Sequence, residues 1–167
     1  MNFKSLFLRL ERSKEFSEFK EKNPEAFLCA GFFIRDYKDG NNQSSVDFAN
    51  NGKITTFTPS ENSFQIKEEE ILDKTRPLSQ FSPDIKIDID QLKELVEKEL
   101  QKNNINGSLE KIIAVLQANP AGGDAMWNLT CFVEGMKIIL VHIDATTQEI
   151  LKFENRSLFD FVRPQKA

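Results

Sequence analysis

The residues with the most reactive side chains in this sequence are few and widely spaced. His142 is the only histidine, and Cys29 and Cys131 are the only cysteines. A hydrolase built on a nucleophile and a base would need Cys131 and His142 together with a third group that orients the base. Two cysteines without a C-x-x-C spacing indicate neither a metal cage nor a disulfide framework, so we interpret both as buried, reduced thiols. We therefore predict no catalytic residue, and a Cys/His hydrolase is the least favoured of three functional hypotheses.

The carboxylates and glycines of the second half form no recognisable ligand pattern. Asp144, Glu149 and the carboxylates of IDID (87–90) would give at most a weak oxygen-ligand site, because the loop spacing of an EF-hand is absent. The segment NPAGGD (119–124) has neither G-x-G-x-x-G nor G-K-S/T and is most simply a turn. We interpret the carboxylates as caps and solvated groups, and we predict neither a metal nor a cofactor.

Composition and charge indicate a globular protein with a core of ordinary size. Of the 167 residues, 40% are hydrophobic and 29% are charged. The 22 basic residues do not cluster and are outnumbered by 26 acidic ones, which argues against nucleic acid as the main partner. No window approaches the roughly 18 apolar residues of a membrane span, and no signal peptide is recognisable. We expect a cytoplasmic protein, exported only if a leader has been removed.

Periodicity predicts a helix followed by four strands in the second half of the chain. Asp88 or Asp90 can cap a helix in which apolar residues such as Leu92, Val96 and Leu100 recur at helical spacing. Four strand-like runs then follow, separated by turn-prone residues: LEKIIAVLQA (109–118), MWNLTCFVE (126–134), KIILVHID (137–144) and EILKFEN (149–155). Because the connections are short, we expect an antiparallel meander.

The first half predicts the same order of elements. A helix over residues 3–22 precedes four strand-like runs: AFLCAGFFIRD (26–36), SSVDFAN (44–50), KITTFTP (53–59) and SFQIKEE (63–69). One shift, 114 minus 30 or 84 residues, lays Ala30 on Ala114 and Phe48 on Phe132. We therefore expect an α+β fold of two similar units, each a helix packed on an antiparallel β-meander. The first unit spans 1–75, a linker spans 76–87 and the second unit spans 88–167. Within the linker region, IKIDID (85–90) can also form a short edge strand.

One short motif closes both halves. ILDKTRP (71–77) and LFDFVRP (158–164) share the pattern Asp-x-x-Arg-Pro. The spacing places Asp73 one helical turn from Arg76, and Asp160 one turn from Arg163, where each pair can form before proline stops the turn. We interpret the motif as a terminator of each unit rather than as an active site.

The end of the second half resembles a known family. The run VHIDATTQEILKFEN (141–155), after the strand MWNLTCFVEG (126–135), is similar to the C-terminal hairpin of PepSY and PepSY-like domains, where a strand ends in Asp-Ala-x-Thr-Gly and the next begins at once. Gln148 stands where the family usually has glycine. The resemblance covers residues 88–155. It implies a helix packed on an antiparallel sheet, in a family associated with binding, peptidase propeptides and inhibition, and it supplies no catalytic residue.

Four strand residues are candidates for contact with a partner. Trp127, which begins a strand after a Gly-rich turn, can mark a binding surface or cover one end of the core. His142 shares strand parity with apolar residues, which predicts an imidazole on a half-buried sheet face. Thr56 and Thr58 belong to the polar strand KITTFTP, whose edge can accept a partner strand.

These observations favour binding over catalysis. We expect a non-enzymatic binding or regulatory module that acts through protein or peptide interaction, using the first unit's strands or a groove between its two sheets. The alternative is a small apolar ligand held in a cystatin-like pocket between helix and sheet, which fifteen phenylalanines permit. The sequence leaves open whether the protein forms a homodimer.

Overall fold

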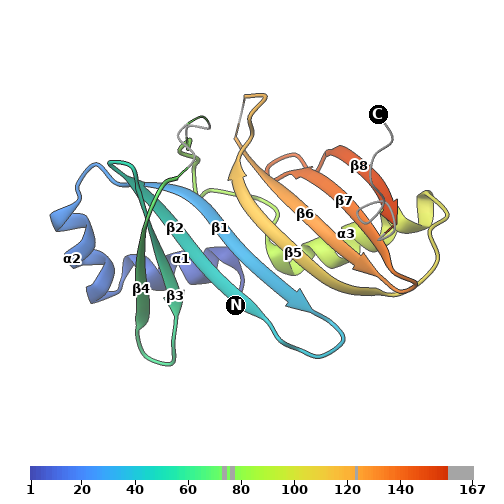
Figure 1. The fold of residues 1–167 in the computed structure, drawn as a ribbon, viewed down its shortest axis with the longest axis horizontal. Coiled ribbons are helices and arrows are strands. Elements are labelled where there is room, and N and C mark those ends of the chain that lie inside the picture. Colours follow the sequence, from blue (N-terminus) through green and yellow to red (C-terminus); the bar gives the residue numbers. More distant parts are fainter. Residues whose placement is uncertain (73–74, 76–77, 123, 158–167) are drawn as a thin grey trace.

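The structure, a computed structural model that describes residues 1–72, 75, 78–122 and 124–157, has one antiparallel sheet (Figure 1). Its eight strands lie in the order β4-β3-β2-β1-β5-β6-β7-β8. The strands are β1 Phe27–Asp36, β2 Gln43–Asn50, β3 Lys53–Pro59, β4 Phe64–Glu70, β5 Leu109–Ala118, β6 Ala125–Val133, β7 Lys137–Asp144 and β8 Ile150–Ser157. The helices are α1 Phe3–Glu11, α2 Lys14–Lys22 and α3 Ile89–Lys102. The predicted α+β class with an antiparallel sheet is confirmed. No helix in the described ranges has the length and apolar character needed to span a membrane.

The sheet is continuous because the first strands of the two halves pair at its centre. The antiparallel ladder between β1 and β5 runs from Gly31–Leu116 to Asp36–Lys111. The expected groove between two separate sheets is therefore wrong. Local patterns do not reveal this ladder, because it joins segments that are far apart in the sequence.

The helices pack on one face of the sheet, which we call the covered face. Alternate residues of a strand point to opposite faces. Phe3 of α1 meets Phe33 edge-on with 6.4 Å between ring centroids, and Phe16 of α2 lies 5.0 Å from Phe48. The buried core on this face is made mainly of residues from α1, α3, the connection before α3 and every strand except the last, while the phenylalanines of α2 are partly buried against it. Its largest fully buried side chain is Trp127.

The helix expected over residues 3–22 is two helices, so that prediction is wrong in its detail. The break is at Ser13, whose hydroxyl accepts a hydrogen bond from Phe16 N at 3.1 Å and donates one to Leu10 O at 2.6 Å. A serine side chain that bonds neighbouring backbone groups competes with the continuous helix and makes a new N-cap. The break lets α2 turn its phenylalanines toward Phe48 and Phe57.

A single buried carboxylate joins the helices of the two halves. Asp88 caps α3 by accepting from Ile89 N at 2.7 Å, and it also accepts from Phe3 N at 2.8 Å and Lys4 N at 2.9 Å in the first turn of α1. Gln91 accepts from Asp88 N at 2.9 Å, which completes a capping box. Of the two caps predicted for this helix, Asp88 is the one that forms.

The segment before α3 is not a strand. Its isoleucines alternate inward, and Lys86 N and Ile87 N both donate to Ala145 O. The alternation of IKIDID therefore reflects a packed connection, and the predicted edge strand is wrong. The Asp-x-x-Arg-Pro residues Asp73, Arg76, Asp160 and Arg163 lie outside the described residues.

Candidate functional site

The face of the sheet opposite the helices, here the open face, carries an apolar band that the described helices leave partly exposed. Its members are partly exposed side chains from four neighbouring strands: Phe32 and Ile34 of β1, Ile113 and Val115 of β5, Phe132 of β6 and Leu140 of β7. The band is contiguous between β1 and β5, where Phe32 lies opposite Val115 and Ile34 lies opposite Ile113. Across β6 and β7 it is interrupted, because Thr130 lies between Ile113 and Leu140. Contiguous exposed apolar surface on a soluble protein marks a contact site more often than scattered single residues do.

One half-buried carboxylate lies beside this band on the open face. Asp47 of β2 is between Ala30 and Thr56 in the sheet, and the Thr56 hydroxyl donates to it at 2.7 Å. None of the ion pairs between described residues includes Asp47. Burial, more than the repulsion from Glu69, raises the pKa of Asp47, while the Thr56 hydrogen bond opposes that rise. The open face thus combines apolar area with a carboxylate that lacks a cation partner in the described chain.

His142 lies on the open face, on the same side of β7 as Leu140, and this face is the half-buried one. His142 is opposite Asn128 on one side and Lys152 on the other, and its side chain is partly buried. Burial and the nearby Lys152 charge lower the pKa of His142, so the imidazole is neutral at physiological pH. The residue offers a hydrogen-bonding group at the margin of the apolar band.

The structure does not bring Cys131 and His142 together. Cys131 lies in the row with Ile112 and Ile139 on the covered face, and it is fully buried. Burial raises the pKa of its thiol to about 12, which leaves no thiolate at neutral pH. Cys29 is also a buried thiol with a pKa raised to about 12, chiefly by burial.

Trp127 belongs to the core and not to the surface. Its side chain is fully buried on the covered face, its indole N–H donates to Ile87 O at 2.8 Å, and its ring meets Phe33 at 5.7 Å. The binding role considered for Trp127 is therefore wrong, and the other interpretation of this residue, a ring that covers core, fits its position. The alternative function, binding of a small apolar ligand, needs a pocket between the helices and the sheet. Core side chains such as Trp127 and Phe33 fill that space.

The predicted free edge along KITTFTP is also wrong, because β3 is an interior strand that pairs with both β2 and β4. Thr56 and Thr58 nevertheless lie on the open face, and Thr58 is exposed. The outer strand on this side is β4, where Lys67 and Glu69 pair at 2.7 Å. Charged side chains on an edge strand oppose pairing with another chain.

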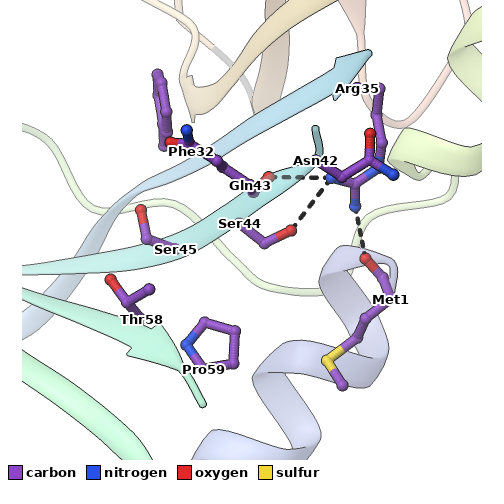
Figure 2. Close-up of a pocket in the computed structure, with 9 residues that line it drawn as sticks. All are labelled: Met1, Phe32, Arg35, Asn42, Gln43, Ser44, Ser45, Thr58 and Pro59. Atoms are coloured by element: carbon purple, nitrogen blue, oxygen red, sulfur yellow. Dashed lines mark hydrogen bonds between the residues drawn. The ribbon is translucent and has the colours of Figure 1, made fainter. Parts of the chain in front are cut away.

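A notch interrupts the sheet between β2 and β3 (Figure 2). Their ladder ends at Val46–Phe57, although β2 begins at Gln43 and β3 continues to Pro59. Proline has no N–H to donate across the sheet, which explains why pairing stops there. The notch contains a pocket of about 400 Å³ lined by Met1, Phe32, Arg35, Asn42, Gln43, Ser44, Ser45, Thr58 and Pro59.

Among the described residues, no three His, Cys, Asp or Glu side chains come together in a group that could hold a metal ion. The carboxylate of Asp144 serves a turn instead. Asp144 accepts from Thr146 N at 2.8 Å and Thr147 N at 2.9 Å, and these backbone hydrogen bonds lower its pKa.

Comparison with known proteins gives a fold and no family. No family model and no curated protein matches this sequence. Among solved structures, a "putative lipoprotein" from Clostridium difficile 630 is similar, with a TM-score of 0.55 and 13% identity. The likeness covers 85% of this chain and 90% of that chain, so it extends beyond either half of the sheet. At this identity it concerns the fold alone.

The apolar band was missed in the sequence, although a signal for it was present. A strand with one solvated face alternates apolar and polar residues, whereas FFI (32–34) and IIAVL (112–116) are apolar without a break. Such runs indicate strands that are apolar on both faces. Only the structure tells which of the two faces the helices leave uncovered.

Proposed function

We propose that this chain is a non-enzymatic binding module that docks a protein partner on the open face of its sheet. The uncovered apolar band is the observation that carries the proposal. It lies on the four neighbouring strands β1, β5, β6 and β7, and polar groups such as Asp47, Thr56 and His142 flank it. An apolar centre with a polar rim is the common anatomy of a protein interface.

We also propose that the two halves arose as tandem PepSY-like units. The strand order supports this, since each half contributes a meander of four strands and the two first strands meet at the centre. A superposition of residues 3–70 on 88–155 in an experimental structure tests the idea. Different paths of the backbone through the two halves would contradict it.

A cytoplasmic location remains part of the proposal, in keeping with two buried free thiols.

The docking proposal is tested by a matched pair of variants. Ile113→Thr with Val115→Thr removes apolar area from the band and keeps β-branched side chains in the strand. Ile66→Thr makes the same change at a 49% exposed position on β4, outside the band. Each tagged protein is used to capture partners from cells of its source, with folding checked by circular dichroism and bound proteins compared by mass spectrometry.

We expect a specific partner to be retained by wild type and by Ile66→Thr and to be lost from the double variant. A partner set that is the same for all three proteins would contradict docking on this face. Light scattering on the same samples tests whether the partner is a second copy, because the double variant would then be monomeric while wild type is dimeric.

A further inference from the structure

The notch between β2 and β3 exposes a short stretch of strand edge. Residues Gln43 to Ser45 pair with β1 on one side, and their other side has no ladder to β3. Along an antiparallel strand, backbone N–H and C=O groups of successive residues alternate between the two edges. At least one of these residues therefore directs its N–H and C=O into the notch. Main-chain groups of this kind are completed by an extended backbone more readily than by a side chain.

A positive charge without a contacting carboxylate forms part of the same pocket. The Arg35 guanidinium donates to Met1 O at 2.7 Å, to Gln43 O at 3.0 Å and to Ser44 Oγ at 3.2 Å (Figure 2). These bonds, with a fourth to Ile34 O, fix its position over the Phe33 ring. All four acceptors are neutral, and no carboxylate of the described residues lies within ion-pair distance of Arg35.

Burial lowers the pKa of Arg35, but the group stays charged, as guanidinium groups in proteins do. The atoms in direct contact with this partly buried cation are carbonyl and hydroxyl oxygens, while the charges of Asp88 and Asp90 act on it from beyond ion-pair distance. An incoming anion can therefore add a direct charge-assisted hydrogen bond. The remaining walls of the pocket include Phe32, Thr58 and Pro59, which offer apolar contacts to the side chains of an incoming strand.

We propose that the notch binds an extended peptide segment of a partner, which adds one short strand to the outer edge of β2 and places an acidic side chain beside Arg35. This proposal rests on the proposed function, because the notch adjoins the open face. Phe32 belongs to the apolar band and also lines the notch. Charge complementarity selects the acidic residue, and the unpaired backbone selects the extended conformation.

The probe is the synthetic peptide Ac-Thr-Val-Glu-Val-Thr-NH2, titrated into ¹⁵N-labelled protein and followed by amide chemical shifts. We expect saturable shifts at Gln43 to Ser45 and at Thr58. The matched peptide with Gln in place of Glu should bind about tenfold more weakly, because a hydrogen bond between charged groups is replaced by a neutral one.

Two protein variants complete the test. Thr58→Trp fills the notch from an exposed position and should abolish the shifts, and Arg35→Lys, which keeps the charge, should remove most of the preference for Glu over Gln. Equal binding of the Glu and Gln peptides to wild type, or shifts that spread over the sheet without centring on residues 43–45, would overturn the proposal. So would the absence of shifts at millimolar peptide.

The open-face double variant at Ile113 and Val115 separates this proposal from the proposed function. It should keep full peptide binding at the notch while it loses the captured partner. If the peptide fails to bind but partner capture still depends on the band, the notch proposal is wrong and the docking face stands.

Discussion

The two faces of this sheet are built from the same strands and differ in what lies on them. On the covered face, Phe33, Ala114 and Leu129 form a row across β1, β5 and β6 and are fully buried. On the open face, the neighbouring positions Phe32 and Val115 are as apolar but remain partly exposed. Hydrophobic character alone therefore does not say which residues stabilise the fold and which are available for contact. The difference is the presence of the helices, and each prediction below changes one face while sparing the other.

The largest effect is expected in the centre of the covered face. Trp127→Ala should lower the free energy of unfolding by about 3–5 kcal/mol, because it leaves a cavity and an unpaired Ile87 carbonyl. Urea denaturation followed by circular dichroism measures this. On the open face, Phe132→Ala should cost less than half as much, since the phenyl ring is partly in water already. If both variants lose the same free energy of unfolding, the two faces do not differ in their contribution to stability.

Adjacent isoleucines of β5 give the sharpest comparison, because Ile112 and Ile113 receive the same substitution on opposite faces. Ile112 is fully buried, so Ile112→Thr should cost about 2–4 kcal/mol through lost packing and a buried hydroxyl. Ile113→Thr should cost about 1 kcal/mol or less. The two midpoints of urea unfolding, measured side by side, check this. If Ile113→Thr proves as costly as Ile112→Thr, another part of the chain covers the band.

The helices stay on the covered face partly through Asp88, whose carboxylate accepts three backbone N–H groups. Asp88→Asn should lower the free energy of unfolding by about 2 kcal/mol, since one acceptor oxygen and the charge are lost. The control is Asp90→Asn in the same helical turn, an exposed position that should change stability by less than about 0.5 kcal/mol. Similar losses in both variants would mean that the carboxylate does not link α1 to α3.

The smallest effect has the opposite sign and concerns Asp47 on the open face. Burial raises its pKa in the folded protein above the unfolded value, so the folded state binds the proton more tightly. Its contribution to stability is therefore greatest at low pH and is lost as pH rises from about 3.9 through the folded pKa. Asp47→Asn should remove this loss and make the protein slightly more stable than wild type at pH 7.

The measurement for Asp47 is the difference in urea midpoint between wild type and Asp47→Asn from pH 4 to pH 8. We expect the difference to grow with pH in favour of the variant. This result would mean that the Asp47 carboxylate lowers the stability of the fold. Such a residue is better explained by contact with a partner than by a structural role. A variant less stable than wild type at pH 7 would instead assign Asp47 a structural role through Thr56.

Much of the local structure was predictable from the sequence. The runs KITTFTP, LEKIIAVLQA and KIILVHID coincide with β3, β5 and β7 at both ends. Their limits are set by nearby residues: Asn51 and Gly52 have positive φ in the turn before β3, and Gly135 does so before β7. The break at Ser13 had a sequence signal too, since serine is a preferred N-cap, but helical periodicity on both sides concealed it.

The candidate site was predictable only in part. Strand parity places Thr56 and Thr58 on one face of β3, and His142 and Leu140 on one face of β7, because residues two apart in a strand share a face. Parity does not say which face is buried, so both interpretations of Trp127, a binding surface and a ring that covers core, stayed open in the sequence. The notch was hidden as well, since Pro59 ends a ladder only after β2 is known to be the neighbour of β3.

The sequence by itself determined the class, the order of elements and most of their ends, because turns, caps and alternation act over a few residues. The tertiary structure decided that β1 pairs with β5, that Asp88 ties both helices to one face, and that the apolar positions of Ile113 and Val115 are left open. These outcomes depend on contacts between segments distant in the sequence. Their stability comes from buried area and shape in the assembled fold, which no short window of residues contains.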